Sequence, residues 1–366
     1  MIWKQCFKTN LRHRAGVIGL SVALRLQEDG QQVTIVARDL PGPFETIDPR
    51  LQINYTSPWG GAHNRWVPPT NLVEQREHQM ALHTFEKMLK LQGNNSEAGI
   101  TLMPGIEYLE APSQAYQALT EAKASTMGLA GFRLLKPEEF PDSRVKLGFT
   151  YDTWCVNPMV YCSFLLRRFG FRGGKVLKQE IRDPAEVFTM KEVAKVDFVV
   201  NCSGAGFNDG NMIVTRGQTC LVANSCPATV TRQNADGSWT FSVPRNFEGG
   251  TIIGGTKEPD NWDPEPSSQV RETLLRKFAA TYPAILGTEG KMTVIKDIVG
   301  RRPTRKGGLR LETEKLHNGK RVIHAYGLGG RGYELSWGVA EGVADLLAKE
   351  LHSTSNPQEA FVKANL

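Results

Sequence analysis

Two glycines near the start of the chain have the spacing of a phosphate-binding turn. Gly16 and Gly19 lie in Ala15-Gly16-Val17-Ile18-Gly19, directly before the apolar residues of an amphipathic helix. Glycines let backbone N–H groups approach a pyrophosphate, and a helix N-terminus adds favourable electrostatics. Arg14, however, stands where the usual G-x-G-x-x-G pattern has its first glycine. The turn alone is therefore compatible with a dinucleotide site and equally with a glycine loop that holds no nucleotide.

The elements around this turn should form part of a parallel α/β sheet. After the helix, residues 33–37 read as a strand, and residues 196–200 form a second apolar run that ends in a turn of small residues, 201–206. Ligands bind at such strand ends in open α/β sheets. The segment before the turn, residues 8–13, is too polar for a buried parallel strand. If the strand expected before the turn is missing from the sheet, the edges of the neighbouring strands would be exposed.

A second part of the chain should be antiparallel. Residues 241–243 and 251–255 flank a turn and are expected to form a hairpin. Residues 321–326 then read as a strand, and a closing helix should run from Ser336 to about Leu351. The fold class is therefore α/β, with a nucleotide-binding part at the start, middle and end of the chain and an antiparallel part inserted.

Composition limits the classes of function. The 366 residues carry a net charge of +6, with 40% hydrophobic and 22% charged residues, which suits a folded protein of two domains. The basic run 301–306 lacks interleaved aromatic residues, and no apolar run is long enough to cross a bilayer. We expect neither nucleic acid nor membrane as a partner. The six cysteines form no C-x-x-C pair and are expected to be free thiols.

Short segments along the chain together resemble the D-amino-acid oxidase family, which includes the D-aspartate oxidases. The resemblance covers nearly everything from Ala15 to about Leu347. The segments that carry it are residues 15–21, 37–41, 57–62, 150–153, 200–204, 216–219, 254–256, 300–305 and 324–338. Their order and spacing are specific to the family.

The resemblance implies non-covalently bound FAD and oxidative deamination of D-amino acids by O2, with a 2-oxo acid, ammonia and hydrogen peroxide as products. It implies a Rossmann-like FAD-binding domain (residues 1–57, 148–215 and 295–352), an inserted antiparallel-sheet substrate domain (58–147 and 216–294) and a tail (353–366). Peroxide production makes a peroxisome plausible, and the terminal Ala364-Asn365-Leu366 is a weak form of a peroxisomal address. A homodimer is also compatible with the resemblance.

The catalytic candidates also follow from the resemblance. Arg302 matches the arginine that binds the substrate α-carboxylate, and a guanidinium suits this because two parallel N–H bonds fix distance and angle. Phe241 stands where the family usually has tyrosine, so the ring can pack but cannot donate a hydrogen bond. Lys257, Arg232 and His63 could favour a substrate with a second carboxylate if they are buried, or else point to solvent.

The residues expected around FAD fall into four groups. They are Ala15, Gly16, Val17, Ile18 and Gly19 at the pyrophosphate; Arg38 and Asp39 near the ribose or phosphates; Ser57, Gly60 and Gly61 by the isoalloxazine; and Ser203, Gly204, Gly329, Gly330, Gly332 and Tyr333 in turns that approach the flavin or the ribityl chain. Backbone contact of this kind suits glycine, which has no Cβ.

Two rival interpretations stay open on the sequence. Arg14 and the polar segment before it suggest a non-catalytic relative with impaired FAD binding. Oxidation of secondary amines, as in glycine or sarcosine oxidases, is opposed only by the family resemblance of residues 300–303. The colour of the purified protein would separate the first rival from an oxidase, because bound flavin is yellow.

Overall fold

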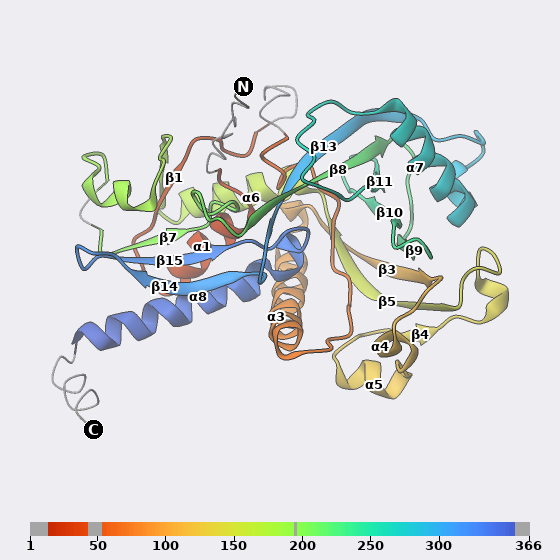
Figure 1. The fold of residues 1–366 in the computed structure, drawn as a ribbon, viewed down its shortest axis with the longest axis horizontal. Helices are drawn as coiled ribbons and strands as arrows, with labels where there is room; N and C mark the ends of the chain where they lie inside the picture. The colour runs from red at the N-terminus through yellow and green to blue at the C-terminus, as the bar shows by residue number, and fades with distance from the viewer. Residues whose placement is uncertain (1–13, 43–52, 194–195, 356–366) are drawn as a thin grey trace, which may run out of the picture.

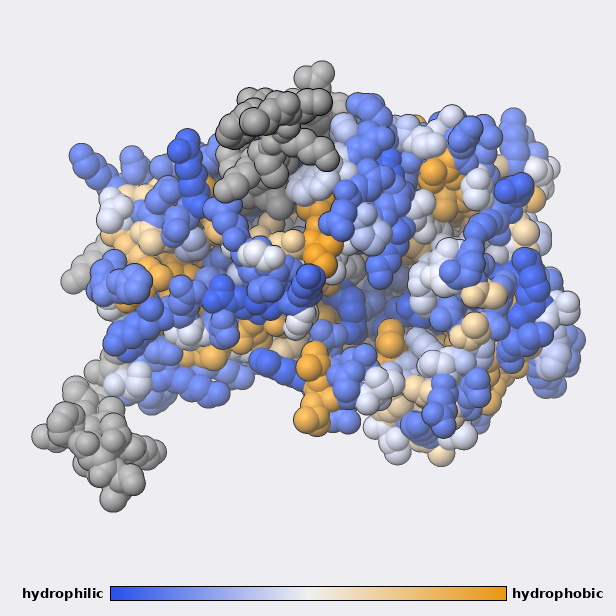
Figure 2. Space-filling model, in the orientation of Figure 1, coloured by the Kyte–Doolittle hydropathy of each residue, from blue (hydrophilic) through white to orange (hydrophobic). Residues whose placement is uncertain are grey.

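The computed structural model describes residues 14–42, 53–193 and 196–355, and the strands within these ranges form three sheets. Two small sheets and their helices make up a cofactor-binding part, and a ten-stranded sheet makes up the rest (Figure 1). Figure 2 shows a largely hydrophilic face that is hollowed between these two parts. The predicted α/β class, with a large antiparallel-rich sheet beside a nucleotide-binding unit, is confirmed.

The small sheets contain the strands that the sequence predicts. β1 (Thr34–Ala37) pairs in parallel with β6 (Lys175–Lys178). In the other small sheet β15 (Arg321–Tyr326) lies between β14 (Arg310–Lys315), its antiparallel partner, and β7 (Phe198–Asn201), its parallel partner. Residues 8–13 lie outside the described residues.

Helices cover these sheets and fix the start of the glycine turn. α1 (Val17–Glu28) packs against α8 (Gly332–Ser355), and α8 also crosses α3 (Leu72–Asn94). Figure 1 shows α8 running along β14 and β15, with α3 at the junction of the two parts. The closing helix begins at Gly332, one turn earlier than predicted, because the glycine turn leads directly into it.

The large sheet is continuous. Its strand order is β12-β8-β11-β10-β9-β3-β5-β2, with β13 also paired to β8 and β4 to β5. The strands are β2 (Ala62–His63), β3 (Ile100–Leu109), β4 (Arg133–Leu134), β5 (Leu147–Val156), β8 (Met212–Val222), β9 (Thr229–Gln233), β10 (Trp239–Pro244), β11 (Thr251–Gly254), β12 (Glu258–Pro259) and β13 (Val294–Arg305). The predicted hairpin is confirmed as the antiparallel pair β10–β11.

Two predicted domain boundaries differ from the sheet boundaries. β5 pairs with β3 along its whole length, and β13 pairs with β8, so both belong to the large sheet. The predicted divisions at residues 148 and 295 placed these strands in the FAD-binding domain. The correction has a physical reason: both strands lead from the large sheet into the cofactor part, and hydrogen-bond pairing rather than chain order decides where a strand belongs.

The described ranges contain four further α-helices. They are α4 (Gln114–Gln117), α5 (Glu121–Thr126), α6 (Pro158–Phe171) and α7 (Ser268–Thr281). The five cysteines in the described ranges are free thiols, as predicted. None of the helices in those ranges combines the length and the apolar composition that a bilayer crossing needs.

Candidate cofactor and substrate site

The predicted glycine turn forms an open helix N-terminus. Gly16 is the N-cap of α1, without a side-chain cap and without an acidic residue in the first turn. The hydroxyl of Ser57 accepts a hydrogen bond from the Val17 N–H at 3.1 Å. A cavity of about 120 Å³ lies against Gly16, Val17 and Ile18 and is closed by Ser57 on the other side. Unpaired helix N–H groups and the helix dipole favour a bound anion here.

Gly16 has a steric role that Gly19 does not share. A Cβ at Gly16 would lie 2.8 Å from the Ser57 hydroxyl oxygen, whereas a Cβ at Gly19 would make an ordinary 3.5 Å contact with Cys202. The turn is also held by its neighbours, because the Tyr55 hydroxyl donates to the Ala15 carbonyl oxygen at 2.6 Å. Tyr55 was not among the predicted residues. Of the two glycines in this turn, only Gly16 would need its neighbour Ser57 to shift before it could carry a Cβ.

Two arginines share one carboxylate beside this turn. The Nε atoms of Arg14 and Arg38 each lie 3.0 Å from a carboxylate oxygen of Asp39. Burial and the nearby Arg38 lower the pKa of Arg14 to about 10. Two guanidinium groups and one carboxylate leave a net positive charge at this end of the cavity, which suits a diphosphate.

A second glycine turn closes the other side of the cavity. Gly329 has a positive φ of 59°, and Gly332 begins α8. The Tyr333 hydroxyl donates to the carbonyl oxygen of Ser57 at 2.6 Å, and burial raises the pKa of this hydroxyl well above its ordinary value. Tyr333 therefore ties the turn after β15 to the segment that contains Gly60 and Gly61.

The turn after β7 supplies another wall. Ser203 and Gly204 line the same cavity as Gly16. The Ser203 hydroxyl accepts the Gly206 N–H at 2.9 Å, and Gly204 has a φ of 76°. Ser203 and Gly204 therefore share a cavity with the Gly16 turn, and their contact with FAD stays a prediction.

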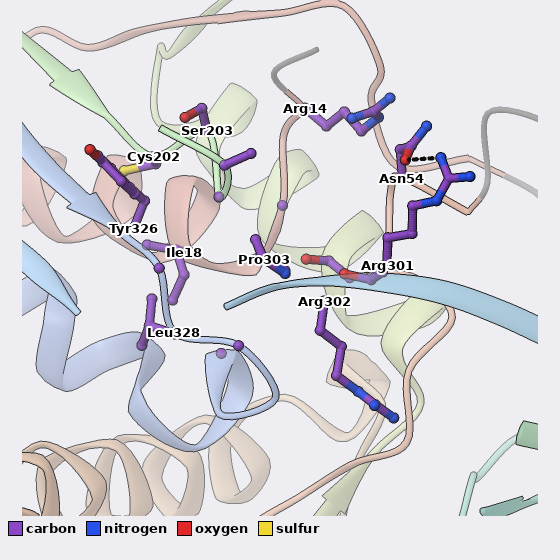
Figure 3. A pocket seen from close by; sticks show the side chains of 18 of the residues that line it. Arg14, Ile18, Asn54, Cys202, Ser203, Arg301, Arg302, Pro303, Tyr326 and Leu328 are labelled. Atoms are coloured by element: carbon purple, nitrogen blue, oxygen red, sulfur yellow. Dashed lines mark hydrogen bonds between the residues drawn. The ribbon is translucent and has the colours of Figure 1, made fainter. Parts of the chain in front are cut away.

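Arg301 and Arg302 point to opposite sides of β13. Figure 3 shows Arg301 turned toward Asn54, to which it donates at 3.1 Å, and Arg302 turned away from it. The Arg302 guanidinium donates to the Thr256 carbonyl oxygen at 3.0 Å. Within the part of the chain that the structure describes, no carboxylate forms an ion pair with Arg302. Burial lowers the pKa of this guanidinium, so it lies in a desolvated place that an anionic ligand would stabilise.

At Gly217 the Arg302 side chain leaves no room for a Cβ, which would lie 2.5 Å from the terminal nitrogen atoms of Arg302. A Cβ at Gly330 would make an ordinary contact, 3.8 Å from the Arg302 Cδ atom. The arginine side chain therefore runs from the turn that begins α8 to the large sheet. This places it between the predicted flavin contacts and the predicted substrate residues.

Phe241 and His63 lie on the large sheet near this point. The Phe241 ring packs against Gly254, and a Cβ at Gly61 would lie 3.5 Å from the ring. Burial and the adjacent Arg65 lower the pKa of His63 to about 3, so its imidazole is neutral at physiological pH. Its Nδ1 atom has no hydrogen-bond partner among the described residues.

The two remaining predicted cations differ in environment. Lys257 is exposed and directly follows Thr256, the acceptor for Arg302. Arg232 is only 2% exposed, and its guanidinium bonds Glu110 at 2.8 Å and Asp142 at 2.9 Å. The prediction that Arg232 offers a free positive charge to a substrate is therefore corrected: two carboxylates from neighbouring parts of the sheet already neutralise it.

Arg245 is a site residue that sequence reasoning missed. Its guanidinium is 6% exposed and donates to the carbonyl oxygens of Trp59 at 2.8 Å and Gly60 at 3.0 Å. Burial lowers its pKa to about 10. Arg245 thus holds the predicted isoalloxazine segment against the end of β10. An arginine directly after an apolar strand was the available signal.

This geometry defines a dinucleotide-binding oxidoreductase, and comparisons with known proteins give the family. The FAD dependent oxidoreductase family matches residues 15–346, so the chain belongs to that family. A D-aspartate oxidase of Talaromyces thermophilus is 44% identical over 91% of this chain and 93% of its own length. A D-amino-acid oxidase of Schizosaccharomyces pombe is 28% identical over 89% of this chain and 92% of its own length.

Solved structures show the fold. A glycine oxidase from Bacillus cereus superimposes with a TM-score of 0.67 at 16% identity, over 92% of this chain and 94% of that one. An L-proline dehydrogenase from P. horikoshii gives a TM-score of 0.68 at 15% identity, over 92% of each chain. At such identities the likeness concerns the backbone arrangement alone.

The residues present fit FAD, the cofactor of this family. The backbone at Gly16 would approach the pyrophosphate closely, because glycine has no Cβ beside Ser57. The uncapped N-terminus of α1 would face the negative charge of the pyrophosphate. Arg14, Arg38 and Asp39 would lie at the adenosine end, and the turns at Ser57 and Gly329 at the flavin end. When bound, FAD supplies the hydride acceptor that amino-acid side chains lack.

Proposed function

We propose that this protein is an oxidase of acidic D-amino acids, with D-aspartate as its preferred substrate. The products would be the 2-oxo acid, ammonia and hydrogen peroxide, with O2 as the electron acceptor. The 44% identity to a D-aspartate oxidase over most of both chains supports the proposal. The members at lower identity include D-amino-acid oxidases.

The observation that carries the proposal is the desolvated guanidinium of Arg302, which forms no ion pair with a carboxylate of the described residues. One N–H group is used by the Thr256 carbonyl oxygen, and the remaining N–H groups can grip a substrate α-carboxylate. The side chain passes Gly330 on the cofactor side. A carboxylate held here would have its α-carbon near the flavin end, where orientation decides the rate.

The second carboxylate of the substrate has a cation within reach. Lys257 follows Thr256 directly, and an exposed ammonium can turn toward a bound side chain. His63 is neutral and can offer a hydrogen bond but no charge. Phe241 supplies packing without a hydroxyl, so binding of simple substrates relies more heavily on Arg302 than it would with tyrosine.

Peroxide release across a panel of D-amino acids tests the proposal. We expect kcat/KM to be highest for D-aspartate, with D-glutamate next and D-alanine lowest. Lys257→Tyr should shift this preference toward neutral substrates by up to about fivefold, which corresponds to one exposed charge pair of about 1 kcal/mol. Substitution of another exposed lysine, Lys291→Tyr in the loop before β13, should change nothing. A Lys257→Tyr enzyme that keeps the original preference would contradict the acidic-substrate proposal.

A non-catalytic relative is the second candidate, and one observation favours it. Arg14 stands in the place of a glycine of the usual phosphate-binding turn. Purified protein that is colourless, and that stays colourless after incubation with FAD and dialysis, would support this candidate. A yellow protein whose flavin absorbance is released on denaturation would support the oxidase.

Location and assembly remain proposals. We propose a peroxisomal location on the basis of the tail Ala364-Asn365-Leu366 and of the peroxide product; the tail lies outside the described residues. A fluorescent fusion that leaves this tripeptide free should co-localise with peroxisomes, and its deletion should disperse the signal. We also propose a homodimer, which light scattering of the purified protein would test.

A further inference from the structure

The guanidinium of Arg245 is buried, and only part of its hydrogen-bonding capacity is used. Its Nη2 atom donates to the carbonyl oxygens of Trp59 at 2.8 Å and Gly60 at 3.0 Å. Its Nε and Nη1 atoms are buried and have no hydrogen-bond partner among the described residues. Arg245 also forms no ion pair with a carboxylate that the structure describes. A buried cation without a counter-charge destabilises a fold, and such groups concentrate at functional sites.

The turn between β10 and β11 fixes the Arg245 side chain. The Arg245 N–H donates to the Gly250 carbonyl oxygen at 2.9 Å. Asn157, the N-cap of α6, donates from its side-chain amide to the Asn246 carbonyl oxygen at 2.9 Å. A Cβ at Gly249 would lie 2.8 Å from the Arg245 Cβ, so the turn closes tightly on this residue. The framework of the large sheet therefore holds the guanidinium in place.

The two carbonyl groups that Arg245 bonds fix the direction of the next two N–H groups. A trans peptide points the C=O of one residue and the N–H of the next to opposite sides, and both peptide bonds here are trans. The N–H groups of Gly60 and Gly61 therefore point away from Arg245. The Gly60 N–H donates to the Thr56 carbonyl oxygen at 3.1 Å, and Thr56 lines the cofactor cavity. The Gly61 N–H has no acceptor among the described residues, and Gly61 is exposed.

The segment 56–61 is anchored from both parts of the molecule. On the cofactor side, the Tyr333 hydroxyl donates to the Ser57 carbonyl oxygen at 2.6 Å, and the Ser57 hydroxyl accepts the Val17 N–H at 3.1 Å. On the side of the large sheet, Arg245 bonds the carbonyl oxygens of residues 59 and 60. Loss of Arg245 should thus release the second half of the segment and leave Ser57 in contact with the glycine turn.

We propose that Arg245 is a positioning residue for the flavin, which presents the Gly61 N–H to a carbonyl oxygen of the isoalloxazine ring. FAD is the cofactor of the family, and Gly61 is among the residues expected beside this ring. The cation lies on the carbonyl side of the peptide, so its charge polarises the peptide and strengthens the N–H as a donor. This role concerns FAD alone and does not depend on which D-amino acid is oxidised.

A comparison of two ligands on the full chain freed of flavin tests this role. ADP shares the adenosine and the pyrophosphate with FAD but lacks the ring. Arg245→Met removes the charge and the donors at similar side-chain length. We expect it to raise the Kd for FAD about tenfold and to leave the Kd for ADP within a factor of about two to three. Arg133→Met, which removes an exposed arginine of β4, is the control and should change neither Kd.

Infrared spectra of the bound flavin supply a readout that does not depend on affinity. A carbonyl group that accepts a hydrogen bond absorbs at lower frequency, so a flavin carbonyl band should move to higher frequency in Arg245→Met.

Arg245→Lys keeps a buried cation and is measured in the same way if Arg245→Met does not fold. Its ammonium lacks the planar fork, so the Kd for FAD should rise about threefold while the Kd for ADP is retained. An unchanged Kd for FAD in a folded variant, equal weakening of FAD and ADP, or flavin carbonyl bands identical to those of the parent would each overturn the proposal. Peroxide release from D-aspartate enters none of these measurements, so the proposed substrate is tested separately.

Discussion

The large sheet and the cofactor-binding part differ in how completely the described residues pair their backbones. The large sheet forms one path from β12 to β2, whereas the described strands of the cofactor-binding part form two separate sheets. Hydrogen-bonded pairing therefore links the substrate side across its whole width, while helices α1 and α8 contribute much of the packing on the cofactor side. Stability and cofactor affinity should accordingly respond to different substitutions.

The two regions also differ in their buried charges. On the large sheet Arg232 is neutralised by Glu110 and Asp142, and Arg65 by Glu107. Beside the cofactor cavity, Arg302 and Arg245 bond carbonyl oxygens and form no ion pair with the carboxylates that the structure describes. Ion pairs therefore stabilise the large sheet, whereas these two cations lie where anionic ligands are expected.

The largest effect on stability should come from the large sheet. Arg232→Met leaves two carboxylates without their cation, and such a broken buried pair costs about 3 kcal/mol. Urea unfolding should show this loss, while the ratio of kcat/KM for D-aspartate to that for D-alanine stays constant. Arg133→Met, which removes an exposed pair with Glu139, is the control and should unfold like the parent. If the ratio of the two kcat/KM values changes in Arg232→Met, Arg232 acts on the bound substrate and the correction made above is wrong.

Gly217→Ala should separate catalysis from cofactor binding. The new Cβ would lie 2.5 Å from the Arg302 guanidinium and must displace it. A shift of about 1 Å can cost about 100-fold in kcat/KM, and FAD affinity should not change. Gly210→Ala places its Cβ in open space and serves as the control. Unchanged turnover in Gly217→Ala would mean that the position of Arg302 does not matter.

Gly16→Ala should instead weaken FAD binding. Its Cβ would lie 2.8 Å from the Ser57 hydroxyl oxygen and disturb the hydrogen bond to Val17. We expect the Kd for FAD to rise about tenfold, or about 1.4 kcal/mol, in a flavin fluorescence titration. The same substitution at Gly19 meets ordinary contacts and should leave the Kd within a factor of two to three of the parent value. Equal effects at the two glycines would argue against close approach of a pyrophosphate at Gly16.

The smallest effect should be the pH dependence that His63 confers. Its pKa is about 3 in the folded protein, below the ordinary 6.5, so the unfolded chain binds the extra proton. The stability that follows from neutral His63 is complete above pH 6.5 and is lost as the pH falls toward 3. His63→Asn should flatten this decline by up to about 1.4 kcal/mol per pH unit. If parent and variant show the same dependence of stability on pH, His63 is solvated in the folded protein and its pKa is not lowered.

The sequence predicts the strands and turns well because their signals are local. Apolar runs and glycines identify β1, β7, the β10–β11 hairpin and the turns at Gly16 and Gly329. The assignment of β5 and β13 to the large sheet depends on pairing across distant segments. That information is absent from local periodicity, which explains the displaced boundaries at residues 148 and 295.

The candidate site also contains residues that the sequence identifies and residues whose role depends on distant partners. Residue types at matched positions identify Gly16 and Ser57, which line one cavity. Ser57 accepts hydrogen bonds from the Val17 N–H and from the Tyr333 hydroxyl. Arg232 could not be judged from its type, because its partner Glu110 lies more than a hundred residues away in the chain. Arg245 was missed because its one sequence signal, a position directly after an apolar strand, does not reveal the two carbonyl oxygens that it bonds.

The central claim is that Arg302 grips the α-carboxylate, and chemical rescue of Arg302→Ala tests it most directly. Peroxide release at saturating FAD should show kcat/KM for D-aspartate reduced about a thousandfold, or about 4 kcal/mol, and partly restored by added guanidinium ion. Arg301→Ala, on the opposite side of β13, should retain most of the parent value and show no rescue. An Arg302→Ala enzyme within tenfold of the parent, or one that guanidinium does not improve, would contradict the claim.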